Sequence, residues 1–177
     1  MSFPVFASGD VLNASDMNGV GLWLVKSQAV GSGVSSVAVT GAFSTNYDNY
    51  LVTWQGGTMS GDTALKCQLG STTSGYYGAY VYSLYTGTTT TSAGDNNAST
   101  FTYVGGGNAS AAVASFNLYG PNKANRTYCD ASNIGYGTQF GRYSGLEIST
   151  TQHTAFTLIP FSGTMTGGTI RVYGYRN

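Results

Sequence analysis

Short β-rich runs, separated by clusters of Gly, Ser, Thr, Asn and Asp, follow one another from Gly21 to the C-terminus. Within them, Val37 and Val39 share one face, and Ile170 and Val172 oppose Arg171. No helical pattern lies between the runs as a crossover, so we expect antiparallel sheets. The spacing is typical of an all-β sandwich or barrel of about ten strands, at residues 22–25, 34–40, 49–55, 64–69, 79–85, 100–104, 112–119, 126–134, 155–159 and 169–175.

Length and composition narrow the possibilities further. A chain of 177 residues suits one domain, and 41% hydrophobic residues can supply its core. Only 8% of the residues are charged, and the seven Lys and Arg do not cluster, so nucleic acid is not an expected partner. Because so few charges keep copies apart, we expect a homo-oligomer.

The N-terminal region predicts neither a signal peptide nor membrane insertion, because it lacks a basic segment and no run of about 18 apolar residues occurs. It does predict a short helix. Asn13 can cap this helix, Asp16 follows three residues later, and Leu12 with Met17 fit a hydrophobic staple before Gly19 ends it. So short a helix needs support from the β-domain or from a partner.

Glycine and small polar residues predict the connections. The pairs Gly56-Gly57 and Gly167-Gly168 suit hairpins or bulges, and the run Gly105–Gly107 before Asn108 suits a flexible turn. Residues 86–99 contain no apolar residue larger than Ala, so we expect an exposed, mobile loop there.

The sequence gives little support for a catalytic function. His153 is the only histidine and no Gly-x-Ser-x-Gly elbow occurs, which favours a polar edge-strand or loop residue over a catalytic base. A glycosidase needs two neighbouring carboxylates, and the sequence leaves open that Asp62 meets Asp130 or Glu147, although no spacing indicates it. We therefore predict that the chain is not an enzyme.

Metal and cofactor sites are not predicted either. The sequence has one histidine, no Asp-x-Asp-x-Asp loop, no Cys-x-x-Cys motif and no phosphate loop. Cys67 and Cys129 lie far apart within strand-like runs, which favours buried free thiols, with a disulfide as the alternative.

Tyrosine is the residue type best suited to recognition. The chain has 14 tyrosines, and residues 76–85 form the densest group. Tyr76, Tyr77, Tyr80 and Tyr82 are the candidate ligand or interface residues, since tyrosine rings stack on sugar faces while their hydroxyls form hydrogen bonds. The alternative is that these rings fill the core or a subunit interface. On the strand, either Tyr80 and Tyr82 or Val81 must face the core.

Residues 6–18, FASGDVLNASDMN, combine an aromatic residue, a Gly-Asp pair, Leu-Asn-Ala and a closing Asn. The segment 168–177, GTIRVYGYRN, is expected to be a terminal strand, and residues 42–50 are expected to lead into another. These segments resemble bacteriophage tail-fibre and minor tail proteins. The resemblance implies a jelly-roll-like, commonly trimeric module of the virion, whose N-terminal segment attaches it to other virion proteins.

On this basis residues 1–25 are expected to be an attachment arm with the short helix, and residues 26–177 the jelly-roll-like β-sandwich domain. The arm has six apolar residues expected to dock on other virion proteins: Phe3, Val5, Phe6, Val11, Leu12 and Met17. The alternative is that the arm packs along its own domain.

Two functions fit these expectations. The first is a tail-fibre or tail-associated module for host attachment, in which the segment 86–99 contacts the host and a cell-surface glycan is a candidate ligand. The second is a capsid decoration (cement) or head-fibre protein that stabilises the shell. We expect the tail location over the head. A glycan depolymerase is a distant third, because such enzymes usually need a long groove on a larger β-helix.

Overall fold

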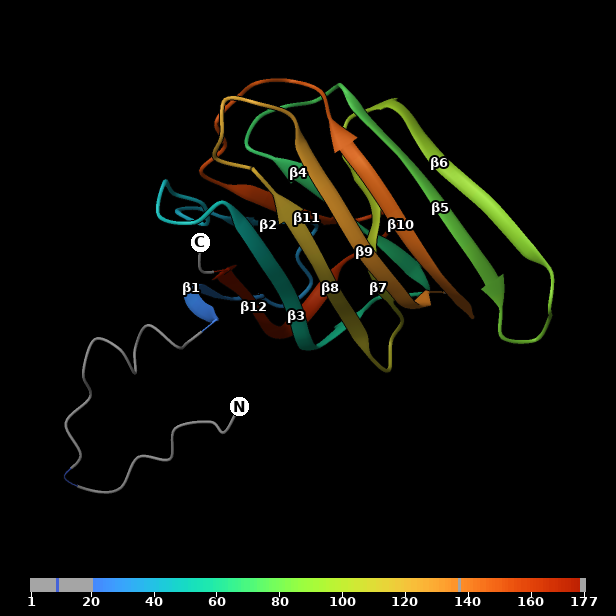
Figure 1. Cartoon of the computed structure of the whole chain (residues 1–177). Helices are drawn as coiled ribbons and strands as arrows, with labels where there is room; N and C mark the ends of the chain where they lie inside the picture. The colour runs from blue at the N-terminus through green and yellow to red at the C-terminus, as the bar shows by residue number, and fades with distance from the viewer. Residues whose placement is uncertain (1–8, 10–20, 137, 176–177) are drawn as a thin grey trace.

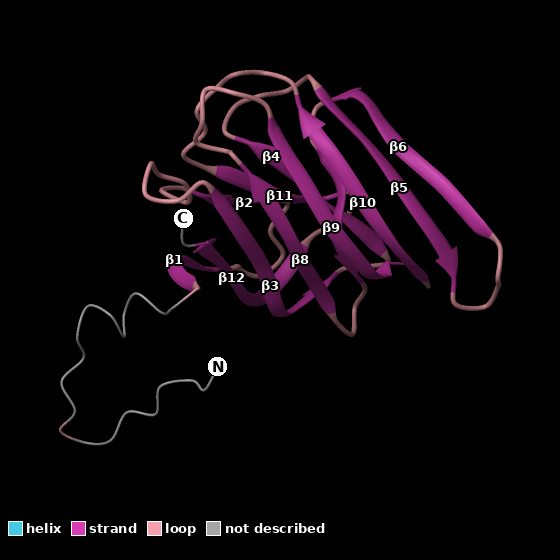
Figure 2. Ribbon diagram, in the orientation of Figure 1, coloured by secondary structure: helices cyan, strands magenta, loops and turns pink. Residues whose placement is uncertain are grey.

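The computed structural model describes residue 9, residues 21–136 and residues 138–175 (Figure 1). This part of the chain forms twelve β-strands and no helix, which confirms the all-β prediction (Figure 2). The strands are β1 (Leu22–Ala29), β2 (Val37–Val39), β3 (Asn49–Met59), β4 (Thr63–Leu69), β5 (Tyr76–Leu84), β6 (Thr90–Ala98), β7 (Phe101–Gly107), β8 (Ala112–Tyr119), β9 (Thr127–Tyr136), β10 (Gln139–Glu147), β11 (Phe156–Pro160) and β12 (Met165–Tyr175).

The strands form two layers, and every pair of hydrogen-bonded strands is antiparallel, as predicted. The front layer has the order β1-β12-β3-β8-β9-β10-β5-β6, and the strands β2-β11-β4-β7 lie behind it (Figure 1). The two layers join where residues 105–107 of β7 pair with residues 112–114 of β8. The described residues therefore adopt a sandwich-like arrangement.

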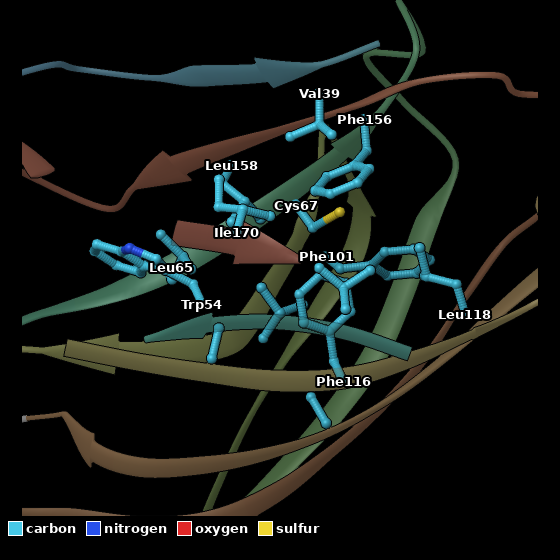
Figure 3. Close-up of a cluster of buried hydrophobic side chains, with 14 of the residues drawn as sticks. Val39, Trp54, Leu65, Cys67, Phe101, Phe116, Leu118, Phe156, Leu158 and Ile170 are labelled. Carbon is cyan, nitrogen blue, oxygen red and sulfur yellow. The ribbon is translucent and has the colours of Figure 1, made fainter. Parts of the chain in front are cut away.

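The hydrophobic core lies between the layers. Trp54 of β3 and Phe116 of β8 share it with Leu65 and Cys67 of β4 and with Phe156 of β11, and all five side chains are buried (Figure 3). Burial of one such large side chain stabilises the fold by about 1.5–3 kcal/mol. Alternate residues of the front layer point away from this core, which leaves one broad sheet face open to solvent.

All ten predicted strands are present, most with shifted ends, and two further strands were not predicted. β6 falls within the segment expected to be a mobile loop, so that prediction is wrong. Its side chains are largely exposed, and its backbone is held by pairing with β5 at the edge of the sheet. An edge strand can be polar, because it forms ladder hydrogen bonds on one side without burying side chains.

Glycines within β10 explain why this strand was not predicted. β10 contains Gly141 and Gly145, which weaken any strand signal. A Cβ at Gly141 would collide with the Val81 carbonyl oxygen, and one at Gly145 would lie 2.6 Å from the Tyr143 hydroxyl. The glycines are therefore required by close packing of neighbouring strands and rings.

Of the other glycine predictions, one is wrong and one is confirmed. The expected turn at Gly105–Gly107 is wrong, because these residues lie in β7 and pair with both β4 and β8. The expected bulge at Gly56-Gly57 is confirmed by a register shift between Trp54 and Gly57. Gly56 and Gly168 have φ angles of 75° and 78°, a backbone conformation that glycine adopts readily.

The N-terminal predictions fall mostly outside the described residues. The expected helix near residues 12–19 and the docking residues Phe3, Val5, Phe6, Val11, Leu12 and Met17 all lie there. Residues 22–25, assigned to the arm, belong to β1 and pair with β12. Across the described ranges, no helix has the length and apolarity needed to cross a membrane.

Candidate functional site

The tyrosine-rich run 76–85 lies mainly on β5, and its rings are divided between core and surface. Tyr76 and Tyr80 are fully buried, whereas Tyr77 and Tyr82 are half-buried. Tyr80 stacks between Tyr82 and Tyr103, with ring centroids 4.9 and 4.5 Å apart. Tyr80 thus faces the core and Val81 faces solvent, and the run is not one continuous exposed platform.

A partly buried hydrogen-bond network connects the neighbouring strands. The hydroxyl of Tyr143 on β10 donates to Asp95 Oδ2 on β6 at 2.6 Å, and Thr102 donates to the same carboxylate through its backbone N–H and its hydroxyl. Burial, together with the contact to Asp95, raises the pKa of Tyr143 above its ordinary value. This network joins the edge strand to the rest of the sandwich and has a structural role.

An exposed aromatic pair of the front layer lies instead where β8 ends and β9 begins. Tyr119 and Tyr128 are 40% and 50% exposed, and they stand directly across from one another in the strand register. Directly paired residues have Cβ atoms about 4.5–5.5 Å apart. The two rings therefore project from adjacent positions on the same sheet face.

A shallow depression of about 440 Å³ adjoins these two rings. Its lining otherwise consists of polar and charged residues with Gly120, namely Asp48, Asn49, Gly120, Lys123, Asn125 and Arg126. Lys123 and Asp48 form a partly exposed ion pair at this site. Such a pair adds little stability, so both side chains can exchange partners at low cost.

The turn between β8 and β9 shapes the depression and is firmly anchored. The backbone N–H of Gly120 donates to the Asp48 carbonyl at 2.9 Å, and Lys123 N–H donates to the Gly120 carbonyl at 3.0 Å. On the other side, the Asn122 side chain donates to the His153 carbonyl at 2.8 Å, and His153 N–H donates to the Pro121 carbonyl at the same distance. The loops that precede β3, β9 and β11 therefore meet at one end of the sandwich (Figure 1).

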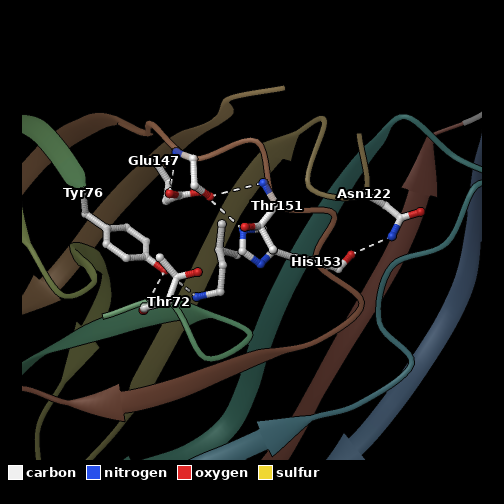
Figure 4. Close-up of polar contacts among 8 residues, drawn as sticks. Thr72, Tyr76, Asn122, Glu147, Thr151 and His153 are labelled. Atoms are coloured by element: carbon white, nitrogen blue, oxygen red, sulfur yellow. Dashed lines mark hydrogen bonds and ion pairs between the residues drawn. The ribbon is translucent and has the colours of Figure 1, made fainter. Parts of the chain in front are cut away.

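His153 is itself held by a buried carboxylate (Figure 4). Its Nε2 lies 3.2 Å from Oε2 of Glu147, and the two side chains are 2% and 1% exposed. Glu147 also accepts hydrogen bonds from the backbone N–H and hydroxyl of Ser149, at 2.7 and 2.9 Å. The Glu147–His153 contact is buried and the Ser149 bonds are partly buried, so the pair positions the loop 148–155 and, through it, the turn beside the depression.

A row of polar side chains continues from the aromatic pair along the open sheet face. Asn117 and Asp130 are paired across β8 and β9, two residues from Tyr119 and Tyr128. Asn117 accepts a hydrogen bond from the Tyr175 hydroxyl at 2.7 Å, and Asp130 accepts two from Arg142, at 2.8 and 3.0 Å. Rings beside amide, carboxylate and guanidinium groups match the apolar faces and hydroxyl groups of a sugar.

The protonation state of Tyr119 favours this use. Partial burial, with the nearby Asp130 carboxylate, raises the pKa of Tyr119 above its ordinary value. A tyrosine hydroxyl is protonated at neutral pH already, and this shift acts in the same direction, so the Tyr119 hydroxyl can donate a hydrogen bond.

The remaining titratable residues do not assemble a reactive centre in the described residues. Glu147 is committed to His153 and Ser149, and Asp130 to Arg142, while Asp62 is exposed on the turn between β3 and β4. His153 is a loop residue, as predicted, but it is buried. Cys67 and Cys129 are free buried thiols, as favoured from the sequence, and no group of three or more His, Cys, Asp or Glu residues in the described part could hold a metal ion.

Sequence reasoning missed Tyr119 and Tyr128 because it followed tyrosine density. A usable signal was present in the alternation of β8, where buried Phe116 and Leu118 place Tyr119 on the opposite, outward face. The proximity of Tyr128 depends on the register of β9, which the sequence does not reveal.

No protein-family model, curated protein sequence or solved structure matches this chain.

Proposed function

We propose that the chain is a non-enzymatic structural module of a bacteriophage virion, a trimeric tail-associated protein that contributes to host attachment by binding a cell-surface saccharide. The observation that supports saccharide binding best is the Tyr119–Tyr128 pair beside a polar depression. The resemblance of both chain ends to phage tail proteins supports the virion assignment, and a jelly-roll-like classification of the sandwich is part of the same proposal.

Attachment requires a binding surface that keeps its shape, and the proposed site meets this requirement. Its two rings project from paired strands, and its turn is hydrogen-bonded on both sides. A preformed surface loses little conformational entropy on binding, which favours recognition of a weakly binding ligand such as a sugar.

Apolar residues on the surface support self-association. Leu22 and Leu24 are exposed on the edge strand β1, and Val81, Tyr85 and Phe140 are exposed around β5 and β10. With few charges to oppose contact between copies, these residues suit subunit interfaces. Analytical ultracentrifugation of the full chain at micromolar concentration tests this part, with a trimer expected and a compact monomer as the contradicting result.

Saccharide binding is tested with purified protein and fragments of the bacterial host envelope. The variants Tyr119→Ala and Tyr128→Ala should each weaken binding about tenfold or more, since a stacking ring contributes on the order of 1–3 kcal/mol at a binding surface. Phe161→Ala is the matched control, because this exposed aromatic residue follows β11 in the layer behind the proposed site. Equal binding by all three variants would contradict the proposed site.

The N-terminal region is proposed to join the module to other virion proteins. Deletion of residues 2–18 should leave the strands intact, because β1 begins only at Leu22. The truncated protein should give an unchanged β-type circular dichroism spectrum but fail to enter particles. Loss of the β-fold on this deletion would favour an arm that packs on its own domain.

A capsid decoration or head-fibre role is the second candidate. The apolar group around Tyr85 and Phe140, whose rings lie 6.4 Å apart, is the observation that favours it, because it provides a surface for clamping shell subunits. Gold labelling of intact particles distinguishes the two locations. Label on the tail supports the first proposal, and label on the head faces supports the second.

A further inference from the structure

We infer that the saccharide bound at the Tyr119–Tyr128 depression is acidic and that Arg126 binds its carboxylate or phosphate group. This inference rests on the proposed function, since it names the class of sugar that the same site would select.

The charges of the depression are not balanced. Lys123 is paired with Asp48, and the neighbouring Arg142 is paired with Asp130 in a two-bond contact. Arg126 also lines the depression, and no carboxylate of the described residues lies within ion-pair distance of it. Among the described residues that line the depression, two cations thus face one anion, which leaves one positive charge at Arg126.

The hydrogen-bonding groups of the lining likewise favour a ligand that is rich in acceptors. Lys123 and Arg126 are pure donors, Asn49 and Asn125 can donate through their amides, and Tyr119 keeps its hydroxyl proton. Among the described residues of the lining, the one carboxylate is that of Asp48, which is already in contact with Lys123. A ligand rich in acceptor oxygens satisfies this lining better than one that offers hydroxyl donors alone.

Arg126 lies in a suitable position relative to the rings. It immediately precedes β9, in which Thr127 is buried and Tyr128 is exposed. Successive residues alternate sides on an extended strand, so Arg126 and Tyr128 share the outward side while Thr127 points inward. One sugar ring can then stack on a tyrosine while its acidic substituent reaches the guanidinium.

The guanidinium group suits this task chemically. It presents paired N–H donors in one plane, which match the two oxygens of a carboxylate or phosphate. Arg126 is exposed, so it gives up little internal bonding when it engages a ligand. An acidic substituent therefore gains a charge-assisted contact that a neutral sugar cannot form.

An array of bacterial oligosaccharides tests the inference with the full chain. The array contains neutral glycans, uronic acid glycans and phosphate-bearing glycans, so it also distinguishes the two acidic groups. The wild-type protein should bind members of an acidic class, and Arg126→Gln should weaken that binding about tenfold, as expected for loss of one charge-assisted contact. Arg171→Gln on β12 is the matched control and should change binding less than about twofold.

The possible outcomes distinguish failure of the acidic specificity from failure of saccharide binding. Equal binding of neutral and acidic glycans, or an unchanged affinity of Arg126→Gln, overturns the inference and leaves saccharide binding intact. If binding is lost in Tyr119→Ala but unaffected by Arg126→Gln, the role of Arg126 is likewise overturned while saccharide binding stands. Absence of binding to every glycan on the array overturns both the acidic specificity and the saccharide site.

Discussion

Glu147 and His153 form a buried pair, with 3.2 Å between Oε2 and Nε2, that connects the end of β10 to the turn beside the proposed binding site. The link from His153 to that turn runs through backbone and amide hydrogen bonds to Pro121 and Asn122. His153, which the sequence predicts only as a polar edge-strand or loop residue, thus joins a buried carboxylate to the turn beside the proposed site.

Replacement of Glu147 by Ala should lower the free energy of unfolding by about 3–5 kcal/mol, because the partners of the buried carboxylate lose their acceptor. Urea denaturation measures this loss. The exposed Asp62→Ala variant is the matched control, with a change below about 0.5 kcal/mol. If Glu147→Ala were as stable as the control, the buried pair would not anchor the loop.

The hydroxyl of Tyr143 should contribute measurably to stability. Tyr143→Phe leaves the ring in place but removes the donor to Asp95, and the expected cost is about 1–3 kcal/mol. Tyr85→Phe, at an exposed position, should cost almost nothing. Hydrogen exchange provides a second measurement, and the amides of β6 should exchange faster in Tyr143→Phe, whereas unchanged protection of β6 would contradict the proposed link.

Gly78 should not tolerate a side chain. A Cβ at this position would collide with the Tyr143 hydroxyl and lie 2.6 Å from the adjacent ring carbon, so Gly78→Ala should destabilise the fold by about 1–3 kcal/mol. Gly61→Ala is the matched control, since a Cβ there would have no atom within 4 Å. In a Tyr143→Leu background the penalty at Gly78 should shrink, and strictly additive effects in thermal unfolding would contradict the steric explanation.

Stability should fall at alkaline pH. Burial raises the pKa of both Cys67 and Cys129 above their ordinary values, so the folded state holds these protons more tightly than the unfolded state. The resulting stabilisation is complete below the unfolded thiol pKa of about 8.5 and is lost as the pH rises from there towards the folded value.

Urea midpoints between about pH 7 and pH 10 measure this loss, because that range spans the unfolded thiol pKa. Cys67→Val removes one of the two buried thiols while keeping an apolar side chain, so its midpoint should decline less steeply than that of the wild type. Identical slopes for the two proteins would show that Cys67 does not contribute.

Several structural features were predictable because they depend on local patterns. The strand 112–119 was predicted with its observed ends, since buried Ala114, Phe116 and Leu118 alternate regularly with more polar positions. The bulge at Gly56-Gly57 and the buried free thiols also follow from local residue preferences. In contrast, β6 and β10 escaped prediction because their hydrogen-bonding partners, rather than their own side chains, hold them in the sheet.

The amino-acid sequence by itself determined the all-β class, the antiparallel sheets and, for runs such as 37–39 and 170–172, which residues share a face, because a period of two is a local property of the chain. Only the tertiary structure decided which tyrosines are exposed, because burial depends on which strand or layer covers each ring. It stacked Tyr80 against Tyr103 of β7 and left Tyr119 beside Tyr128. The candidate site is therefore a product of strand register between segments, which no local pattern encodes.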